Sequence, residues 1–292
     1  MKILNFKYLS VLPLIAFTGV FLGLPLVQLV IMAFGDVTLR AGTFTINFVG
    51  FENFNRMLDD ELFLNSIRVT LVFTVAAVLL TLLFGTVIAI AVDGLTRHSA
   101  WIQNIVVWPA IVTPVVISVI WLLILSPQIG LLNKIFEFIG LEKQIWLGEP
   151  TPALIAVIAV DVWHWTPVVF LFVYTALKGV DSSILEAAKV DGATYFVRLK
   201  SVVLPLIVPA LIAAAALRVV MSVKAFDEMY LLTFGGPANA TSVITIYLKR
   251  VFLESFDYGY GAALSLTVVL MVLMTLLVML GGQRILRRRN VE

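Results

Sequence analysis

The sequence contains no cysteine and only two histidines, His98 and His164. A chain without cysteine has no disulfide framework, no thiolate metal site and no cysteine nucleophile. The two histidines are far apart in sequence, which argues against a zinc or di-iron site because such sites need clustered ligands. The phosphate-binding pattern G-x-x-x-x-G-K-[ST] is also missing. We therefore expect no metal site, no cofactor and no ATPase site of this type in the chain.

Charge is scarce as well, since 13% of the residues are charged and 61% are hydrophobic. Soluble domains have about 25% charged residues. Several apolar runs reach the length of roughly 20 residues that crosses a bilayer. A soluble protein would have to hide all of these runs from water at once. The composition therefore predicts an all-α, polytopic membrane protein.

The apolar runs predict six transmembrane helices in one membrane domain over residues 1–292, at 11–34, 67–92, 101–125, 152–177, 206–230 and 261–280. The first run is longer than the apolar core of a signal peptide, so we expect an uncleaved anchor. Pro109 and Pro114 predict kinks in the third span. Residues 35–65 are expected to form a loop with a short interfacial segment, and 126–151 a loop with an amphipathic piece at 131–139.

The distribution of lysine and arginine predicts the orientation. With both termini in the cytoplasm, the inner segments hold eleven basic residues, Arg97 among them, and five acidic residues. The outer segments then hold eight basic and twelve acidic residues. The inner side has a net charge of +6 and the outer side one of −4. This bias places both ends, and the polar segment 178–205, in the cytoplasm.

That polar segment carries helix signals. Asp181, Ser182 and Ser183 are common N-cap residues, and Glu186 suits the positive end of a helix dipole. An apolar stripe follows and is interrupted at Gly192, after which 195–204 forms a second helical stretch. We predict two short helices that meet at Gly192. On physical grounds alone, they fit a groove on a soluble partner and the lipid headgroups equally well.

The same segment reads L-E-A-A-K-V-D-G-A-T-Y-F-V-R-L-K-S-V-V-L-P from Leu185 to Pro205. It resembles the EAA loop of the membrane subunits of ATP-binding-cassette importers, E-A-A-x3-G-x9-I-x-L-P, with Val202 in the isoleucine position. Residues 226–237 and 256–263 are similar to two further segments of sugar-importer permeases of the maltose and glycerol-phosphate type. The resemblance extends over nearly the whole chain from the second span onward.

This resemblance implies a type I importer permease fold and a set of partners. They are a second, homologous permease that completes a heterodimer, two ATPase subunits that bind ATP and Mg, and a periplasmic binding protein. It also implies a bacterial inner membrane, a sugar-like substrate and no nucleic acid. The EAA loop would transmit ATPase motion to the spans through Glu186, Ala187, Ala188, Asp191 and Gly192.

Two charges lie deep inside predicted spans, away from the span ends, which usually marks a pathway or a buried pair. At 1.5 Å per residue, Asp161 is about 14 Å from the outer end of its span and Arg218 about 20 Å from the inner end of its own. These depths are similar in a core about 30 Å thick. A structural salt bridge between the two side chains is therefore one interpretation.

The other interpretation is a substrate path. Helical spacing puts one set of side chains on a common face of the fifth span and another set on a common face of the fourth. In the family that the chain resembles, these two helices line the path. The first set is Arg218, Met221, Ser222 and Ala225, and the second is His164, Trp165 and Val168.

Two other classes of function are possible. A secondary carrier or channel without ATPase subunits would show inverted repeats and broken helices around a midplane ion site, and neither is evident. An intramembrane enzyme would need a catalytic set that the sequence does not supply. The solute stays open among a monosaccharide, a disaccharide, a polyol, glycerol phosphate and a sulfonated sugar.

Overall fold

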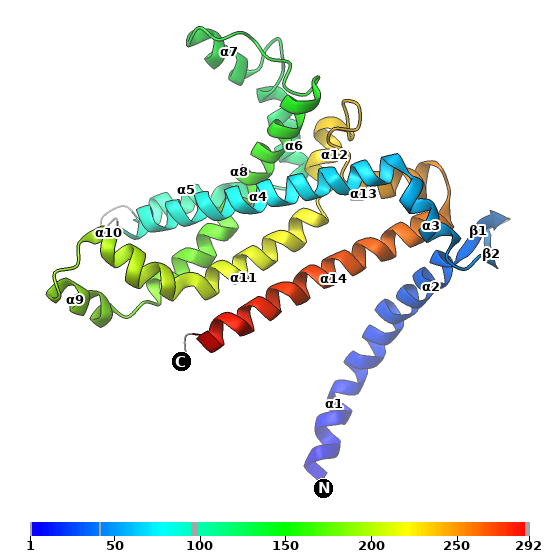
Figure 1. The fold of residues 1–292 in the computed structure, drawn as a ribbon, viewed down its shortest axis with the longest axis horizontal. Helices are drawn as coiled ribbons and strands as arrows, with labels where there is room; N and C mark the ends of the chain where they lie inside the picture. The colour runs from blue at the N-terminus through cyan, green and yellow to red at the C-terminus, as the bar shows by residue number, and fades with distance from the viewer. Residues whose placement is uncertain (1, 41, 95–98, 290–292) are drawn as a thin grey trace. The chain divides into compact units, whose positions relative to one another are not determined.

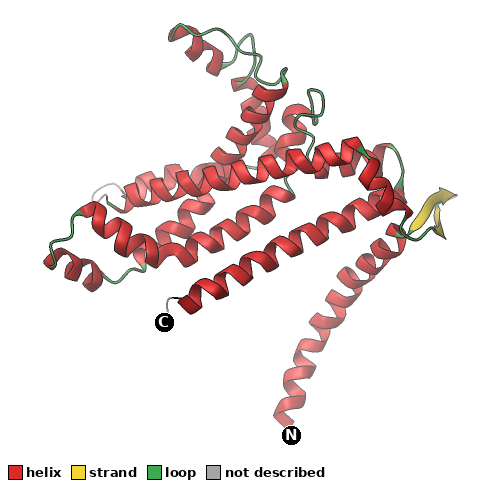
Figure 2. Ribbon diagram, viewed as in Figure 1, coloured by secondary structure: helices red, strands yellow, loops and turns green. Residues whose placement is uncertain are grey.

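The computed structural model describes residues 2–40, 42–94 and 99–289, so Arg97 and His98 lie outside the described residues. The chain is mostly helical (Figure 1), and a two-stranded hairpin at residues 35–48 interrupts the helices (Figure 2). Two compact units can be distinguished, residues 1–64 with 247–271 and residues 65–246 with 272–292. Below, these are called unit 1 and unit 2, and each is described by itself.

Within the described residues, five helical segments are long and apolar enough to cross a membrane. Two of them have interior π-helical turns, η1 (Gly19–Gly23) and η2 (Leu199–Val203). A sixth candidate is a pair of helices bent by 98°. The five segments are Ser10–Ala33, Glu61–Asp93, Pro150–Lys178, Tyr195–Val223 and Tyr258–Leu277, and the bent pair is Ala100–Ile111 with Pro114–Ile124.

The predicted third span at 101–125 coincides with the bent pair, and a break stands in place of the kink expected at Pro114. α5 (Ser99–Ile111) contains Pro109, and α6 (Pro114–Ile124) begins at Pro114. Thr113 between them is extended, with φ −70° and ψ 147°. Proline disfavours the helical conformation in the residue before it, which explains why the helix breaks at this point. Pro109 stays inside its helix.

Unit 1 contains α1 (Lys2–Thr18), α2 (Leu24–Ala33) and a segment that we predicted as a loop. That prediction was wrong for most of residues 35–65. β1 (Gly35–Arg40) and β2 (Thr43–Phe48) form an antiparallel hairpin in which Gly35 pairs with Phe48 and Arg40 with Thr43. α3 (Glu52–Asp59) follows, and α4 (Glu61–Asp93) then begins six residues earlier than the predicted span.

A polar cluster fastens three segments of unit 1 around Asp60. One carboxylate oxygen accepts from the backbone N–H groups of Leu62 and Phe63, at 3.0 and 3.1 Å, and so caps α4. The other accepts from the hydroxyls of Tyr247 and Tyr260. Burial alone would raise the pKa of Asp60, but these hydrogen bonds outweigh it and hold the pKa below its ordinary value. The three segments are the start of α4, α13 (Ile244–Lys249) and the start of α14 (Tyr258–Arg289).

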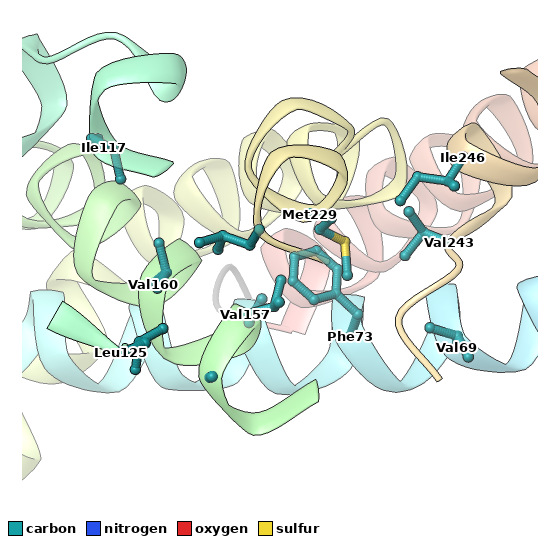
Figure 3. Close-up of a cluster of buried hydrophobic side chains, with 12 residues drawn as sticks. Val69, Phe73, Ile117, Leu125, Val157, Val160, Met229, Val243 and Ile246 are labelled. Atoms are coloured by element: carbon teal, nitrogen blue, oxygen red, sulfur yellow. The ribbon is translucent and has the colours of Figure 1, made fainter. Parts of the chain in front are cut away.

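Unit 2 is built around α8 (Pro150–Lys178), which packs against α5 and against α11 (Leu204–Val223). Two hydrophobic clusters fill it. In the first, Phe73 of α4 lies close to Val157 of α8 and Met229 of α12 (Asp227–Thr233), as Figure 3 shows. The second joins α4, α8 and α11 near their other ends and includes Val92, Phe170 and Ile207.

The remaining elements correct two further boundaries. α11 ends at Val223 and α12 is a separate helix, so the predicted fifth span at 206–230 was too long at its end. α14 runs from Tyr258 to Arg289 and exceeds the predicted 261–280 at both ends. The predicted amphipathic piece at 131–139 is present as α7 (Leu131–Phe138). The other short elements are α9 (Ser182–Val190), α10 (Tyr195–Arg198) and η3 (Arg250–Glu254).

Candidate functional site

The polar segment between α8 and α11 forms two short helices, as predicted. Asp181 caps α9, because its side chain accepts from the backbone N–H of Ser183 at 2.9 Å. α10 follows after a turn and continues through η2 into α11, whose first turn contains a proline. The chain therefore passes from α8 through α9 and α10 to α11 without a long unstructured linker.

A closed turn ends α9 at Gly192. The N–H of Gly192 donates to the carbonyl of Lys189 at 3.0 Å, and the N–H of Ala193 donates to that of Ala188 at 3.0 Å. These two bonds define a Schellman motif, which needs a left-handed residue after the C-cap. Gly192 supplies it with φ +79°, and a Cβ there would meet no atom within 4 Å. The glycine is required by its backbone conformation and not by crowding.

The outward face of α9 is exposed. Glu186 and Ala187 are exposed, Ala188 is half-buried, and Asp191 and Gly192 at the end of the helix are exposed. Val190 lies near them and is 88% exposed. An exposed valine beside small and acidic residues suits contact with another surface better than contact with water. The five predicted coupling residues thus lie on or directly after one accessible helix.

A second group of polar residues is buried in unit 2. Arg218 of α11 is 1% exposed, and its Nη2 donates to Asp161 Oδ2 of α8 at 2.5 Å. Its Nε donates to Thr81 Oγ1 of α4 at 3.3 Å. The guanidinium carbon also lies 5.6 Å from the centroid of the Trp165 ring. Arg218 thereby joins three helices through one side chain.

His164, one turn along α8 from Asp161, forms the neighbouring contact. Its Nδ1 lies 2.5 Å from Glu228 Oε1 in the first turn of α12, and both side chains are buried. The His164 and Trp165 rings are 4.9 Å apart. Sequence reasoning missed Glu228 as a partner, since it was counted among the outer acids. No local signal pointed to this pairing, because an acid just beyond an apolar helix is ordinary.

The predicted path residues differ in their positions. His164, Arg218 and Ser222 are buried, while Trp165, Val168 and Met221 are half-buried. Arg218 and Ser222 share a face of α11, and Arg218 Nη1 and Ser222 Oγ have no hydrogen-bond partner among the described residues.

Ala225 corrects the predicted common face. α11 ends at Val223, so Ala225 lies outside the helix, and its carbonyl accepts from Thr245 Oγ1 at 2.5 Å. The spacing argument failed there because a face is defined only while the helix continues.

The buried group consists of the Arg218–Asp161 ion pair and the contact between His164 and Glu228. Among the described residues, no three His, Cys, Asp or Glu side chains are grouped so as to hold a metal ion. A buried charge is costly unless it is paired and hydrogen-bonded, which accounts for the pairing of Arg218 with Asp161. The group can hold four elements together or present polar groups to a solute.

Comparison with known proteins gives the family. Residues 82–291 match the family described as the binding-protein-dependent transport system inner membrane component. The chain is 34% identical over 268 residues to the trehalose/maltose transport system permease protein MalF of Thermococcus litoralis, covering 91% of this chain and 89% of the relative. It is 32% identical over 275 residues to the sn-glycerol-3-phosphate transport system permease protein UgpA of Agrobacterium fabrum, with the same shares.

A solved structure shows the same fold at lower sequence identity. It is the crystal structure of a bacterial ABC transporter involved in the import of the acidic polysaccharide alginate, 23% identical. The match has a TM-score of 0.85 and covers 97% of this chain and 96% of the other. The chain therefore belongs to the binding-protein-dependent transport system inner membrane components, and it has the fold of a type I ABC importer permease.

Proposed function

We propose that this permease carries a sugar or sugar-like solute inward by alternating access, driven by separate ATPase subunits. Membership of the family makes the chain a multi-pass inner-membrane component of a binding-protein-dependent importer. Two relatives are named as transport system permeases, one for trehalose and maltose and one for sn-glycerol 3-phosphate, and these names support the solute class. They do not favour the alternative of a carrier or channel that works without ATPases.

The observation that carries the coupling proposal is α9 itself. It is exposed, capped at both ends and continuous with α8 and α11 through short connections. A helix held in this way moves as a rigid body when a partner grips it, and its movement acts first on α8 and α11. We assign the ATPase contact to Glu186, Ala187, Ala188, Asp191 and Gly192. ATP and Mg would be bound by the partner ATPases, and this chain would supply no ATPase site.

We further propose that the solute passes beside the buried polar group of unit 2. Hydroxyl groups of a sugar pair well with charged and amide-like side chains, and its apolar faces pack on aromatic rings. Trp165 provides a half-buried ring next to Arg218 and His164. Val168, Met221 and Ser222 complete the proposed lining. Ala225 lies beyond α11, so its place in the lining rests on the family resemblance alone.

The assembly that we propose has five protein chains. Four of them form the membrane complex, and the fifth is the binding protein that delivers the solute. This permease pairs with a second, homologous permease, two ATPase subunits bind on the cytoplasmic side, and a periplasmic binding protein brings the solute. A solved complex of an alginate ABC transporter with its periplasmic protein supports this arrangement, because that complex contains a chain with the same fold as this one. The excess of basic residues on the α9 side supports cytoplasmic termini.

ATP-driven uptake by the complete complex in proteoliposomes tests the proposal. Glu186→Ala should lower uptake at least tenfold, with a matching loss of stimulated ATP hydrolysis. Glu142→Ala is the matched control, because Glu142 is an exposed acid of unit 2 in the loop before α8. A panel of sugars, polyols and glycerol phosphate, screened for the ligand that raises the melting temperature of the binding protein, identifies the solute. Normal uptake by Glu186→Ala would refute the coupling role.

A further inference from the structure

A cavity of about 220 Å³ lies where the ends of α4 and α8 meet the segment that carries α9, α10 and η2. We call it the α9 cavity. Apolar side chains, among them Ile90, Leu177 and Leu185, form one part of its wall. At about 30 Å³ per water molecule, the volume corresponds to roughly seven waters. The α9 cavity can therefore hold a small polar group with a short apolar extension.

The charges around the α9 cavity do not cancel. Its lining contains one acid, Asp93, and two bases, Lys189 and Arg198. Asp93 is already paired with Lys178, whose Nζ lies 2.8 Å from Asp93 Oδ1 and which also faces the Tyr174 ring. Within the described ranges 2–40, 42–94 and 99–289, Lys189 and Arg198 have no ion-pair partner. The cavity thus retains two positive charges beside an apolar wall.

The cavity lies on a different side of α9 from the exposed face. Leu185 and Lys189 are four residues apart and share the side that lines the cavity. Glu186 and Val190 are each one position further along, so they point about 100° away around the helix. A partner that contacts Glu186 and Val190 can therefore leave Lys189 directed at the cavity. The α9 cavity and the proposed ATPase contact are separable by mutation.

We infer that the α9 cavity binds a phosphate group, carried by an anionic phospholipid or by a free phosphate compound. Arginine presents a planar fork that matches phosphate oxygens, and lysine binds phosphate as a point charge. Basic side chains at the ends of membrane helices attract anionic headgroups. The apolar wall suits the glycerol and first methylenes of a lipid. This inference rests on the cavity and its charges and is independent of the solute that the permease carries.

Titration of the purified permease complex, followed by native mass spectrometry, tests the site. The probes are phosphatidylglycerol, phosphatidylcholine and, in a separate arm, inorganic phosphate. The double variant Lys189→Gln with Arg198→Gln should bind phosphatidylglycerol roughly 30-fold more weakly, and each single variant about fivefold, from the usual contribution of one basic residue near an anionic headgroup. Lys200→Gln is the matched control, since Lys200 is an exposed base of η2 that does not line the cavity.

The arms distinguish the two sources of phosphate. Saturable binding of phosphatidylglycerol that inorganic phosphate does not displace identifies a lipid headgroup, whereas displacement by phosphate identifies a site that free phosphate shares. Lys189→Arg keeps the charge and should keep the binding, which provides a test if the double variant does not assemble. The inference is overturned if the Gln variants bind both probes as the wild type does, or lose no more than Lys200→Gln loses. If the Gln variants lose the ATPase subunits but bind phosphatidylglycerol as the wild type does, Lys189 and Arg198 serve the ATPase contact and not a phosphate site. That result would overturn the inference too.

Discussion

Removing one partner of the Asp161–Arg218 ion pair should destabilise the protein far more than removing both. The paired atoms are 2.5 Å apart, and the side chains are 3% and 1% exposed. A buried charge that loses its partner typically costs about 3–5 kcal/mol. We therefore expect this loss in the free energy of unfolding for Arg218→Met and for Asp161→Leu. Replacing both with apolar residues is often neutral or stabilising, so the double variant should recover most of the loss.

The measurement is a double-mutant cycle on the purified protein in mild detergent, with unfolding followed by circular dichroism during titration with a denaturing detergent. The matched control is the exposed pair Lys143–Glu137, with the same kind of N–O contact at 3.1 Å and side chains that are 51% and 57% exposed. Exposed pairs contribute about 0–1 kcal/mol. Lys143→Met, Glu137→Leu and their combination should therefore change the free energy of unfolding by less than about 1 kcal/mol.

The same cycle decides between the two interpretations of Arg218. If the pair is only structural, the double variant folds and transports. If Arg218 also contacts the solute, the double variant folds but loses uptake. Additive losses in the cycle, with no recovery in the double variant, would refute the claim that the two charges depend on each other.

Three further predictions concern single positions. Gly192→Ala should destabilise the end of α9 by about 1 kcal/mol, because φ is +79° there, and Gly192→Asn should cost less; hydrogen exchange of α9 measures both. Glu228→Gln should keep the contact with His164 and most of the stability, while Glu228→Leu should lower the melting temperature by several degrees, since it leaves the imidazole buried without a partner. Asp60→Asn should lower the melting temperature at neutral pH. Because the folded-state pKa of Asp60 is lowered, its stabilisation is present above the ordinary value of about 3.9 and is lost as pH falls through the lower folded value. The difference between wild type and Asp60→Asn should therefore shrink as thermal unfolding is measured at lower pH, and a constant difference would contradict the assigned hydrogen bonds.

The helices and the coupling segment were predictable because their signals are local. Long apolar runs define the membrane helices whatever they pack against, and capping residues define where α9 begins and ends. Asp181 and Gly192 are both found in the roles that their residue types suggested. The prediction was wrong for the end of α11, because no proline or glycine in the sequence indicates where this helix ends. Lys224 ends the helix without such a signal.

The hairpin at residues 35–48 was missed although the sequence contained its signal. T-F-T-I-N-F alternates strictly between polar and apolar residues, and D-V-T-L-R before it alternates as well, with a glycine between the two runs. In the hairpin, Val37 pairs with Ile46 and Leu39 with Phe44, so the apolar members share a face. The alternation was overlooked because each run is only five or six residues long beside runs of 20 or more.

The pairing of His164 with Glu228 could not have been predicted from spacing, because the two residues are 64 positions apart. Periodicity predicts which side chains share a helix face, but not which face of another helix they meet. Asp161 and Arg218 could be matched by depth because both lie inside long apolar runs. Glu228 lies just after one, where an acid is ordinary. A buried partner in such a place becomes visible only when the tertiary packing is known.

The buried group also limits how a movement of α9 could reach the path. Arg218 ties α11 to α8 and α4, and His164 ties α8 to α12. Breaking the buried Arg218–Asp161 pair would cost several kcal/mol, and breaking the His164–Glu228 contact would leave two buried polar groups without a partner. These four helices should therefore shift together and not slide past one another. A lever acting on α8 and α11 would therefore move one packed body. The opening and closing that alternating access requires would then occur at the surfaces of this body, which is where a second permease subunit would meet it.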